Sequence, residues 1–299
     1  MRAEGGQMRK RLFRYGLPLL LLLAVLQVFA VGSTDAYRVY QGTREKKTFS
    51  NVGGAIHYAV NLPRSYVIRT ATRREVWTSE VPILEYHAFS TKQEHDVWFV
   101  TADAFEKQLR YLSEHGYSSI SFQELAKAWY EHRPLPPKPV IISIDDGYMN
   151  NYTIAYPLLK KYKMKASIFL TTKMIGADAN HFGWPEIREM EGSGLVTFEA
   201  HGVSHQNLTK LSEAHARREL VDAKQVLEEK LEHPVVCYSY PGGYNNAKIR
   251  QMVEAAGYFF GTVGKGGYAS MSQGAYELQR IIVNGTQPPY QFVESLKDK

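Results

Sequence analysis

Hydrophobic positions recur with two different periods along most of the chain. Short apolar runs typical of buried strands cover residues 81–86, 140–144, 166–170, 196–200, 235–240, 259–263 and 278–283. Apolar residues at helical spacing cover residues 101–116, 121–132, 152–162, 185–191, 212–231 and 248–256. Strands that alternate with helices predict an α/β fold with a mostly parallel sheet, either open or closed into a barrel. Because no convincing linker interrupts residues 81–299, we expect one domain there.

The chain begins with a basic stretch that is followed by an apolar run. Residues 1–16 carry five basic residues and one acidic residue, and residues 17–31 are apolar except for Gln27. Positive residues before a short apolar core are typical of export signals. A core of about 15 residues is short for a complete membrane span. We therefore expect residues 1–32 to be a signal peptide or an uncleaved anchor, with the protein secreted or held on the extracellular face of the membrane.

Residues 33–80 are polar and contain scattered aromatic residues, which is compatible with a stalk or with a small appended sheet.

The formal net charge of the chain is +6, and residues 1–16 contribute +4 of it. The other charges are scattered, with no basic stripe interleaved with aromatics, so we expect no nucleic-acid partner and membrane contact through the N-terminal segment only. The single cysteine, Cys237, lies in an apolar run and is expected to pack in the core.

Two adjacent carboxylates follow the apolar run at residues 140–144. Asp145 and Asp146 precede Gly147, and two carboxylates this close together are costly unless a metal or a proton neutralises one of them. Open α/β sheets and barrels carry their active sites at the C-terminal ends of the strands. One carboxylate could hold a metal while its neighbour handles a proton, although the same three residues could also form a simple turn.

Two other segments also follow predicted strands. His201 and His205 come after residues 196–200, and two imidazoles with one carboxylate are a common ligand set for Zn²⁺ or a similar divalent ion. Such a pair also arises by chance in a chain with ten His. The sequence Pro241-Gly242-Gly243-Tyr244 comes after residues 235–240. Its glycines let the backbone approach a ligand and its N–H groups could bind an oxyanion, although an ordinary turn has the same composition.

Taken together, these segments resemble the polysaccharide deacetylase family, the carbohydrate esterases with a NodB-homology domain. The family's Thr-Phe-Asp-Asp-Gly-like motif corresponds to residues 143–147, and its His-Ser/Thr-x-x-His motif to residues 201–205. The resemblance spans residues 81–299 and implies a distorted (β/α) barrel of about seven strands with a metal at its C-terminal mouth. It also implies that Asp145 is the general base. The implied metal ligands are Asp146, His201 and His205.

The resemblance implies a chemistry as well. A divalent ion, zinc or alternatively cobalt or nickel, would polarise an acetamide carbonyl and activate a water, and Asp145 would take the proton of that water. Pro241 and Gly242 would form the oxyanion site. Candidates for stacking on sugar rings are Tyr244, Trp184 and Tyr268. The expected activity is N-deacetylation of an amino-sugar polymer, either poly-N-acetylglucosamine, peptidoglycan or a chitin-like glycan.

The chain departs from the family pattern at three positions. Gly202 replaces a Ser or Thr, Ser239 replaces an Arg, and Arg280 stands where a late His usually supplies the general acid. The losses of Arg and His favour an alternative in which the fold binds glycan without catalysis. A third interpretation, a small-molecule amidase or imidase, is disfavoured by the export segment. A serine hydrolase is unsupported because the chain contains no Gly-x-Ser-x-Gly motif.

Residues 81–87 and 278–281 resemble the poly-N-acetylglucosamine deacetylase branch of the family, which carries Tyr-His in its first strand. We therefore hypothesise that His87 replaces the late His as general acid and that Arg280 replaces the missing Arg beside Asp145. Closure of a barrel brings the first and last strands together, which makes both substitutions geometrically feasible. The catalytic role requires the His87 imidazole to lie within ~8 Å of the metal site. The alternative is that His87 forms structural hydrogen bonds only.

Overall fold

The structure, a computed structural model, describes residues 36–297, which belong to one compact unit. The segment predicted to direct export, residues 1–32, lies outside the described residues. Within residues 36–297, no helix is long and apolar enough to cross a membrane.

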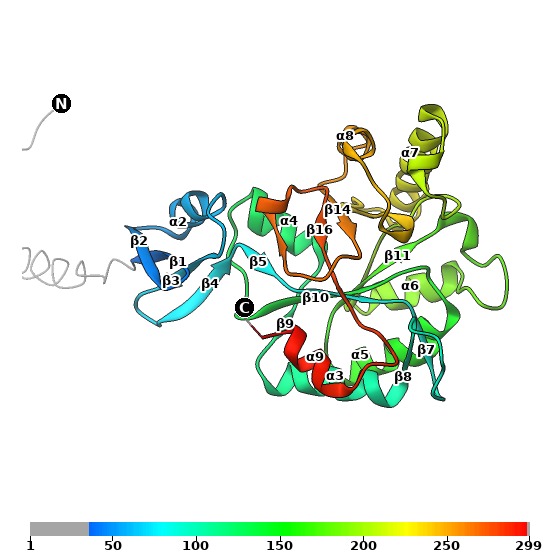
Figure 1. The fold of residues 1–299 in the computed structure, drawn as a ribbon, viewed down its shortest axis with the longest axis horizontal. Helices are drawn as coiled ribbons and strands as arrows, with labels where there is room; N and C mark the ends of the chain where they lie inside the picture. Colours follow the sequence, from blue (N-terminus) through cyan, green and yellow to red (C-terminus); the bar gives the residue numbers. More distant parts are fainter. Residues whose placement is uncertain (1–35, 298–299) are drawn as a thin grey trace, which may run out of the picture. The chain divides into compact units, whose positions relative to one another are not determined.

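The largest sheet consists of parallel strands in the order β16-β14-β13-β12-β11-β10-β6-β17 (Figure 1). These strands are β6 (Ile83–Tyr86), β10 (Pro139–Ile144), β11 (Ala166–Leu170), β12 (Val196–Ala200), β13 (Cys237–Ser239), β14 (Phe260–Val263), β16 (Leu278–Gln279) and β17 (Ile281–Ile282). The short β9 (Ser118–Ser119) adds to β10. All six residues of β10 are buried, as expected for a parallel strand that is covered on both faces.

The sheet is nearly closed because its last strand changes partners. β16 and β17 are separated by Arg280, and β16 pairs with β14 whereas β17 pairs with β6. The sequence-predicted strand 278–283 therefore crosses from one end of the sheet to the other. The distorted (β/α) barrel implied by the sequence is confirmed, and eight strands are found instead of about seven because this strand is split.

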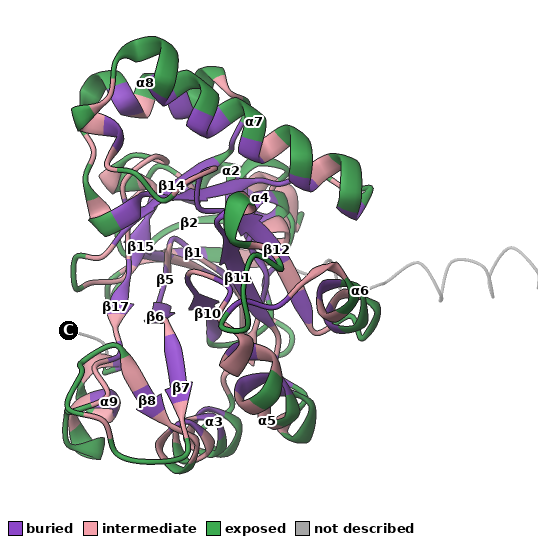
Figure 2. Ribbon diagram, turned by 90° about the vertical axis from the view of Figure 1, so that its right-hand side faces the viewer, coloured by how far each residue is buried: buried purple, intermediate pink, exposed green. Residues whose placement is uncertain are grey.

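Helices cover the outside of the barrel and turn their buried faces toward the strands (Figure 2). They are α3 (Ala102–Glu114), α5 (Tyr156–Tyr162), α6 (Trp184–Gly192), α7 (Glu213–Leu231), α8 (Ala247–Ala255) and α9 (Pro289–Ser295), whereas α4 (Phe122–Tyr130) packs at one end of the barrel. The predicted start of α3 is confirmed, because the Thr101 side chain accepts the N–H of Ala104 at 3.1 Å. Two short pairs complete the unit: β5 (Glu80–Val81) with β15 (Ala269–Ser270), and β7 (Ala88–Ser90) with β8 (Phe99–Thr101).

Of the two alternatives for residues 33–80, the described part, residues 36–80, shows a small appended sheet. Its antiparallel strands follow the order β2-β1-β3-β4, and one helix packs on it. The elements are β1 (Tyr37–Gln41), β2 (Arg44–Phe49), α2 (Val52–Ala59), β3 (Ser65–Arg69) and β4 (Arg74–Thr78). Alternation along β1 and β3 places Val39 opposite Val67 on the buried face, against α2.

The small sheet and α4 together cover the N-terminal end of the barrel strands. The buried Trp77 donates its indole N–H to the carbonyl of Ala128 in α4 at 3.2 Å. The Trp129 ring in turn lies 5.7 Å from that of Phe260, at the start of β14. Cys237 belongs to the same buried cluster, as its sequence context predicted. Because this end of the barrel is filled, chemistry is left to the opposite end.

The packing of Trp77 generates a stability prediction. Trp77→Ala should lower the free energy of unfolding by about 3–5 kcal/mol, because it leaves a cavity between the small sheet and α4 and removes a buried hydrogen bond. Chemical denaturation monitored by circular dichroism would measure the change. Tyr290→Ala, at a side chain that is 62% exposed, is the control and should change it by less than about 0.5 kcal/mol. Equal effects of the two substitutions would contradict the assigned packing.

Candidate active site

The two aspartates leave β10 on a sharply turned backbone. The N–H of Asp145 continues the sheet by donating to the carbonyl of Tyr86 at 2.9 Å. Asp146 and Gly147 then adopt φ values of +76° and +77°. A Cβ atom at Gly147 would lie 2.8 Å from a methyl carbon of Leu170, so this position requires glycine. The turn gives the neighbouring carboxylates different nearest partners, although His201 lies within 4.0 Å of both.

Asp146 lies beside the two histidines that follow β12. Its Oδ1 atom is 3.5 Å from Nε2 of His201 and 3.3 Å from Nε2 of His205. Nδ1 of His201 lies 2.8 Å from the carbonyl oxygen of Ser239. Because a carbonyl only accepts, Nδ1 carries the proton and Nε2 keeps its lone pair for a ligand.

This donor set fits a divalent ion. Ligand atoms about 2.0–2.1 Å from a tetrahedral Zn²⁺ stand roughly 3.3 Å apart, close to the two separations from Asp146. One carboxylate and two imidazoles leave a coordination position for water or substrate. Asp146, His201 and His205, the ligands predicted from the sequence, are thus brought together, although the same donors would also accept Co²⁺ or Ni²⁺.

Asp145 is buried and faces Arg280 instead. The guanidinium donates from Nη1 to Oδ1 at 2.7 Å and from Nη2 to Oδ2 at 2.8 Å. Ser239, the residue that replaces the family's Arg, donates its hydroxyl to Oδ2 of Asp145 at 3.2 Å. Burial by itself raises the pKa of Asp145, but the charge and hydrogen bonds of Arg280 outweigh burial and hold this pKa well below its usual range.

His87 lies beside the same carboxylate. Its Nε2 atom is 4.0 Å from Oδ2 of Asp145, and Nε2 of His201 is also 4.0 Å from that oxygen, so the two imidazole nitrogens lie no more than about 8 Å apart. The His87 ring packs against Trp98, with 4.4 Å between ring centroids. The distance condition for His87 as a general acid is therefore met.

Sequence reasoning missed Glu85. This buried carboxylate lies 3.1 Å from Nε of Arg280 and 3.9 Å from Nε2 of His87. Burial raises its pKa, and the nearby Arg280 opposes this only in part. The position of Glu85 in β6, two residues before His87, is the only sequence signal that could have indicated it.

The loop that carries the histidines is held by Glu219, a second residue missed from the sequence. This buried side chain on α7 accepts the backbone N–H groups of Val203 at 2.8 Å and Ser204 at 2.9 Å, and also the Ser204 hydroxyl. Gly202 has φ +86°, and a Cβ there would lie 2.9 Å from the Glu219 carboxylate. The family's Ser or Thr is therefore absent where this loop has no room for a side chain, and Ser204 supplies a hydroxyl instead.

The predicted residues of the turn after β13 differ in their exposure to solvent. Pro241 is buried, Gly242 has φ +65°, and Tyr244 is 58% exposed with its ring close to Gly242. Trp184 and Tyr268, proposed for sugar stacking, are half-buried against the core. The exposed Trp98, beside His87, was not selected from the sequence, which gives no indication of this contact.

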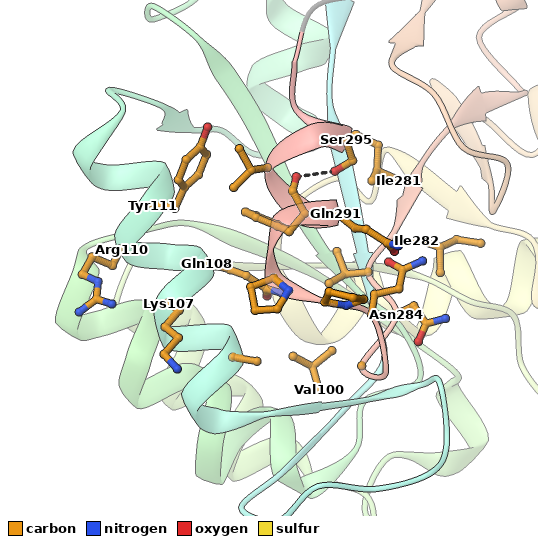
Figure 3. A pocket seen from close by; sticks show the side chains of 18 of the residues that line it. Val100, Lys107, Gln108, Arg110, Tyr111, Ile281, Ile282, Asn284, Gln291 and Ser295 are labelled. Carbon is orange, nitrogen blue, oxygen red and sulfur yellow. Dashed lines mark hydrogen bonds between the residues drawn. The ribbon is translucent and has the colours of Figure 1, made fainter.

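A separate pocket of about 340 Å³ lies between α3 and the C-terminal segment (Figure 3). Its labelled polar side chains include Lys107, Gln108, Asn284 and Gln291. None of the clustered carboxylates or imidazoles described above lines it. The residues with catalytic potential therefore lie at the barrel mouth and not in this pocket.

Sequence relatives identify the family of this chain. Residues 132–261 match the sequence profile named polysaccharide deacetylase. The Bacillus subtilis protein YxkH, which bears the name of a polysaccharide deacetylase, is 32% identical over 222 residues, covering 73% of this chain and 78% of YxkH. The chain belongs to the polysaccharide deacetylase family. A Staphylococcus aureus poly-β-1,6-N-acetyl-D-glucosamine N-deacetylase is 27% identical over 209 residues, covering 66% of this chain and 71% of that enzyme.

Solved structures support the same assignment of this polysaccharide deacetylase. The Streptococcus pyogenes deacetylase PplD in complex with acetate aligns with a TM-score of 0.69 and 27% identity, over 73% of this chain and 99% of that one. A polysaccharide deacetylase from Bacillus cereus aligns with a TM-score of 0.67 and 21% identity over 88% of this chain and 90% of that one, which supports the fold.

The contacts of Glu219 generate a prediction about metal affinity. Glu219→Ala should lower the affinity for Zn²⁺ or Co²⁺ by about 10–100-fold, because groups that orient metal ligands typically contribute this much. Isothermal titration of each ion into the folded variant would measure it. Glu229→Ala, an exposed position on the same helix, is the matched control. An unchanged affinity in a folded Glu219→Ala variant would show that the loop keeps its shape without this carboxylate.

Proposed function

We propose that this member of the polysaccharide deacetylase family is an exported, metal-dependent hydrolase that removes N-acetyl groups from an amino-sugar polymer. The observation that carries the proposal is the pairing of two clusters at one barrel mouth. One cluster offers donors for a divalent ion, and the other holds Asp145 as a buried, ionised carboxylate. Poly-N-acetylglucosamine is the substrate that we favour, because the Staphylococcus aureus relative is named for it. Peptidoglycan and chitin-like glycans are the alternatives.

The two clusters have complementary roles. When bound by Asp146, His201 and His205, a divalent ion would polarise the acetyl carbonyl and lower the pKa of a water from 15.7 to about 7. Asp145 is a weak base, since Arg280 lowers its pKa. A carboxylate this acidic can take the proton of a water only if that water is itself acidified. The protein therefore supplies an ionised base whose action depends on the metal.

Three further residues, His87, Gly242 and Tyr244, are assigned roles from their positions at the barrel mouth. We infer that His87 donates a proton to the leaving amine, since it lies next to Asp145 at the same mouth. The backbone N–H of Gly242 would stabilise the oxyanion, and the exposed Tyr244 would contact the sugar. The alternative of an inactive glycan-binding protein was based on the missing Arg and His. The positions of Arg280 and His87 weaken that argument.

Release of acetate tests the proposal. The fragment 33–299 should release acetate from N-acetylglucosamine oligomers when Zn²⁺ or Co²⁺ is added, and a chelator should abolish the release. Asp145→Asn should bind metal but lose activity by at least about 100-fold, whereas His201→Ala should lose both. Metal content would be measured by atomic absorption.

Three outcomes would each contradict one part of the proposed mechanism. Release that survives exhaustive chelation would refute metal dependence. An active Asp145→Asn variant would remove this residue from the base role, and unchanged metal in His201→Ala would refute the ligand set. If the folded fragment binds metal but releases no acetate from these oligomers or from peptidoglycan, the inactive glycan-binding alternative is favoured over the proposal.

The pKa of Asp145 generates a prediction about pH. In Arg280→Met the burial of Asp145 is no longer opposed by a cation, so its pKa should rise. Because catalysis requires the ionised form, the acidic limb of the profile of kcat/KM against pH should move to higher pH. Arg280→Lys, which keeps a positive charge, should move it less. An acidic limb at the same pH in all three proteins would show that ionisation of Asp145 does not control activity.

A further inference from the structure

Charge is divided unequally between the two sheets. Residues 36–78 contain eight Lys or Arg and two Asp or Glu, a net charge of +6. Residues 79–299 contain 23 Lys or Arg and 26 Asp or Glu, a net charge of −3. The positive charge beyond residue 35 therefore belongs to the small sheet, which corrects the expectation that it is scattered.

Several of these cations gather along one edge of the small sheet. β2 is an outer strand, and its Arg44, Lys46 and Lys47 are exposed (Figure 1). The exposed Arg64 lies near the same end, because its carbonyl accepts the N–H of Gly42, in the turn before β2, at 2.9 Å. We call Arg44, Lys46, Lys47 and Arg64 the basic edge. Within residues 36–297 none of the four forms an ion pair, although the Lys47 ammonium lies over the rings of Phe49 and Tyr58, so Arg44, Lys46 and Arg64 are the most available to an anion outside the protein.

We propose that the basic edge docks onto the anionic headgroups of a phospholipid bilayer. The apolar run ends at residue 31, and β1 begins at Tyr37. The five intervening residues can span at most roughly 17 Å, whatever their conformation. A retained apolar run would therefore hold the small sheet at the membrane surface, where clustered Lys and Arg attract anionic lipids. This contact adds to the one expected from the N-terminal segment and does not depend on the deacetylase activity.

Vesicle binding by the fragment 36–299 tests the proposal, because this fragment contains the compact unit and lacks the apolar run. It should bind vesicles of phosphatidylcholine with phosphatidylglycerol, but not vesicles of phosphatidylcholine, and added salt should reverse the binding. The triple variant Arg44→Gln, Lys46→Gln, Arg64→Gln should bind on the order of 100-fold more weakly, since each cation near the surface contributes about fivefold. Circular dichroism would verify that it is folded.

A second triple variant controls for net charge. Arg188→Gln, Arg218→Gln and Lys230→Gln remove the same charge from exposed positions on helices of the barrel. Binding by this variant should stay within about twofold of the wild-type fragment. Equal losses in both variants would overturn the proposal, because net charge would then suffice.

Two further outcomes would also overturn it. Binding to soluble polyphosphate but not to anionic vesicles would identify an anionic polymer as the partner. Unchanged vesicle binding by the first variant, together with self-association in size-exclusion chromatography, would show that the charges protect an exposed strand edge from pairing.

Discussion

The buried ion pair between Arg280 and Asp145 joins the last strand of the barrel to the strand that carries the carboxylate proposed as the general base. Burying such charges is costly, and it is tolerated only where geometry and further hydrogen bonds compensate. Here the guanidinium of Arg280 donates two hydrogen bonds to Asp145, and its Nε atom lies 3.1 Å from the Glu85 carboxylate. Arg280 is the residue at which the chain passes from β16 to β17, so barrel closure and the orientation of Asp145 have the same origin. Loss of this pair would affect the fold and the chemistry together.

The same pair explains how two adjacent aspartates can coexist. Two ionised carboxylates in one site would raise the pKa of one of them. The positive φ values of Asp146 and Gly147 direct the side chains apart, so Asp145 meets Arg280 while Asp146 meets the two histidines. Arg280 thus neutralises Asp145, while Asp146 is left to the two histidines, of which His201 also lies 4.0 Å from Asp145. The division that we propose between proton transfer at Asp145 and metal binding at Asp146 depends on these two backbone angles, and the second of them requires Gly147.

The predicted parts of the fold and site share one physical basis. Parallel strands bring their C-terminal ends to one mouth, so residues that follow apolar runs, such as Asp146 and His201, could be placed together from the sequence. The meeting of Arg280 with Asp145 was foreseen because barrel closure joins the first and last strands. Glu85 and Glu219 were missed for different reasons. Glu85 lies inside a strand, where a carboxylate is not expected, and Glu219 acts from a helix whose orientation toward the 201–205 loop depends on tertiary packing.

The small sheet could not be predicted from the sequence, because most of its strands are polar and its core depends on contacts with α4, such as that of Trp77. The small sheet and the proposed active site lie at opposite ends of the barrel strands. Trp77 and α4 lie at the N-terminal ends of the barrel strands, whereas Asp145 and its partners follow their C-terminal ends. A basic edge docked on lipid headgroups would leave the proposed active site at the end of the strands away from the small sheet. A polymer outside the membrane could then reach Asp145 without displacing the protein from the bilayer.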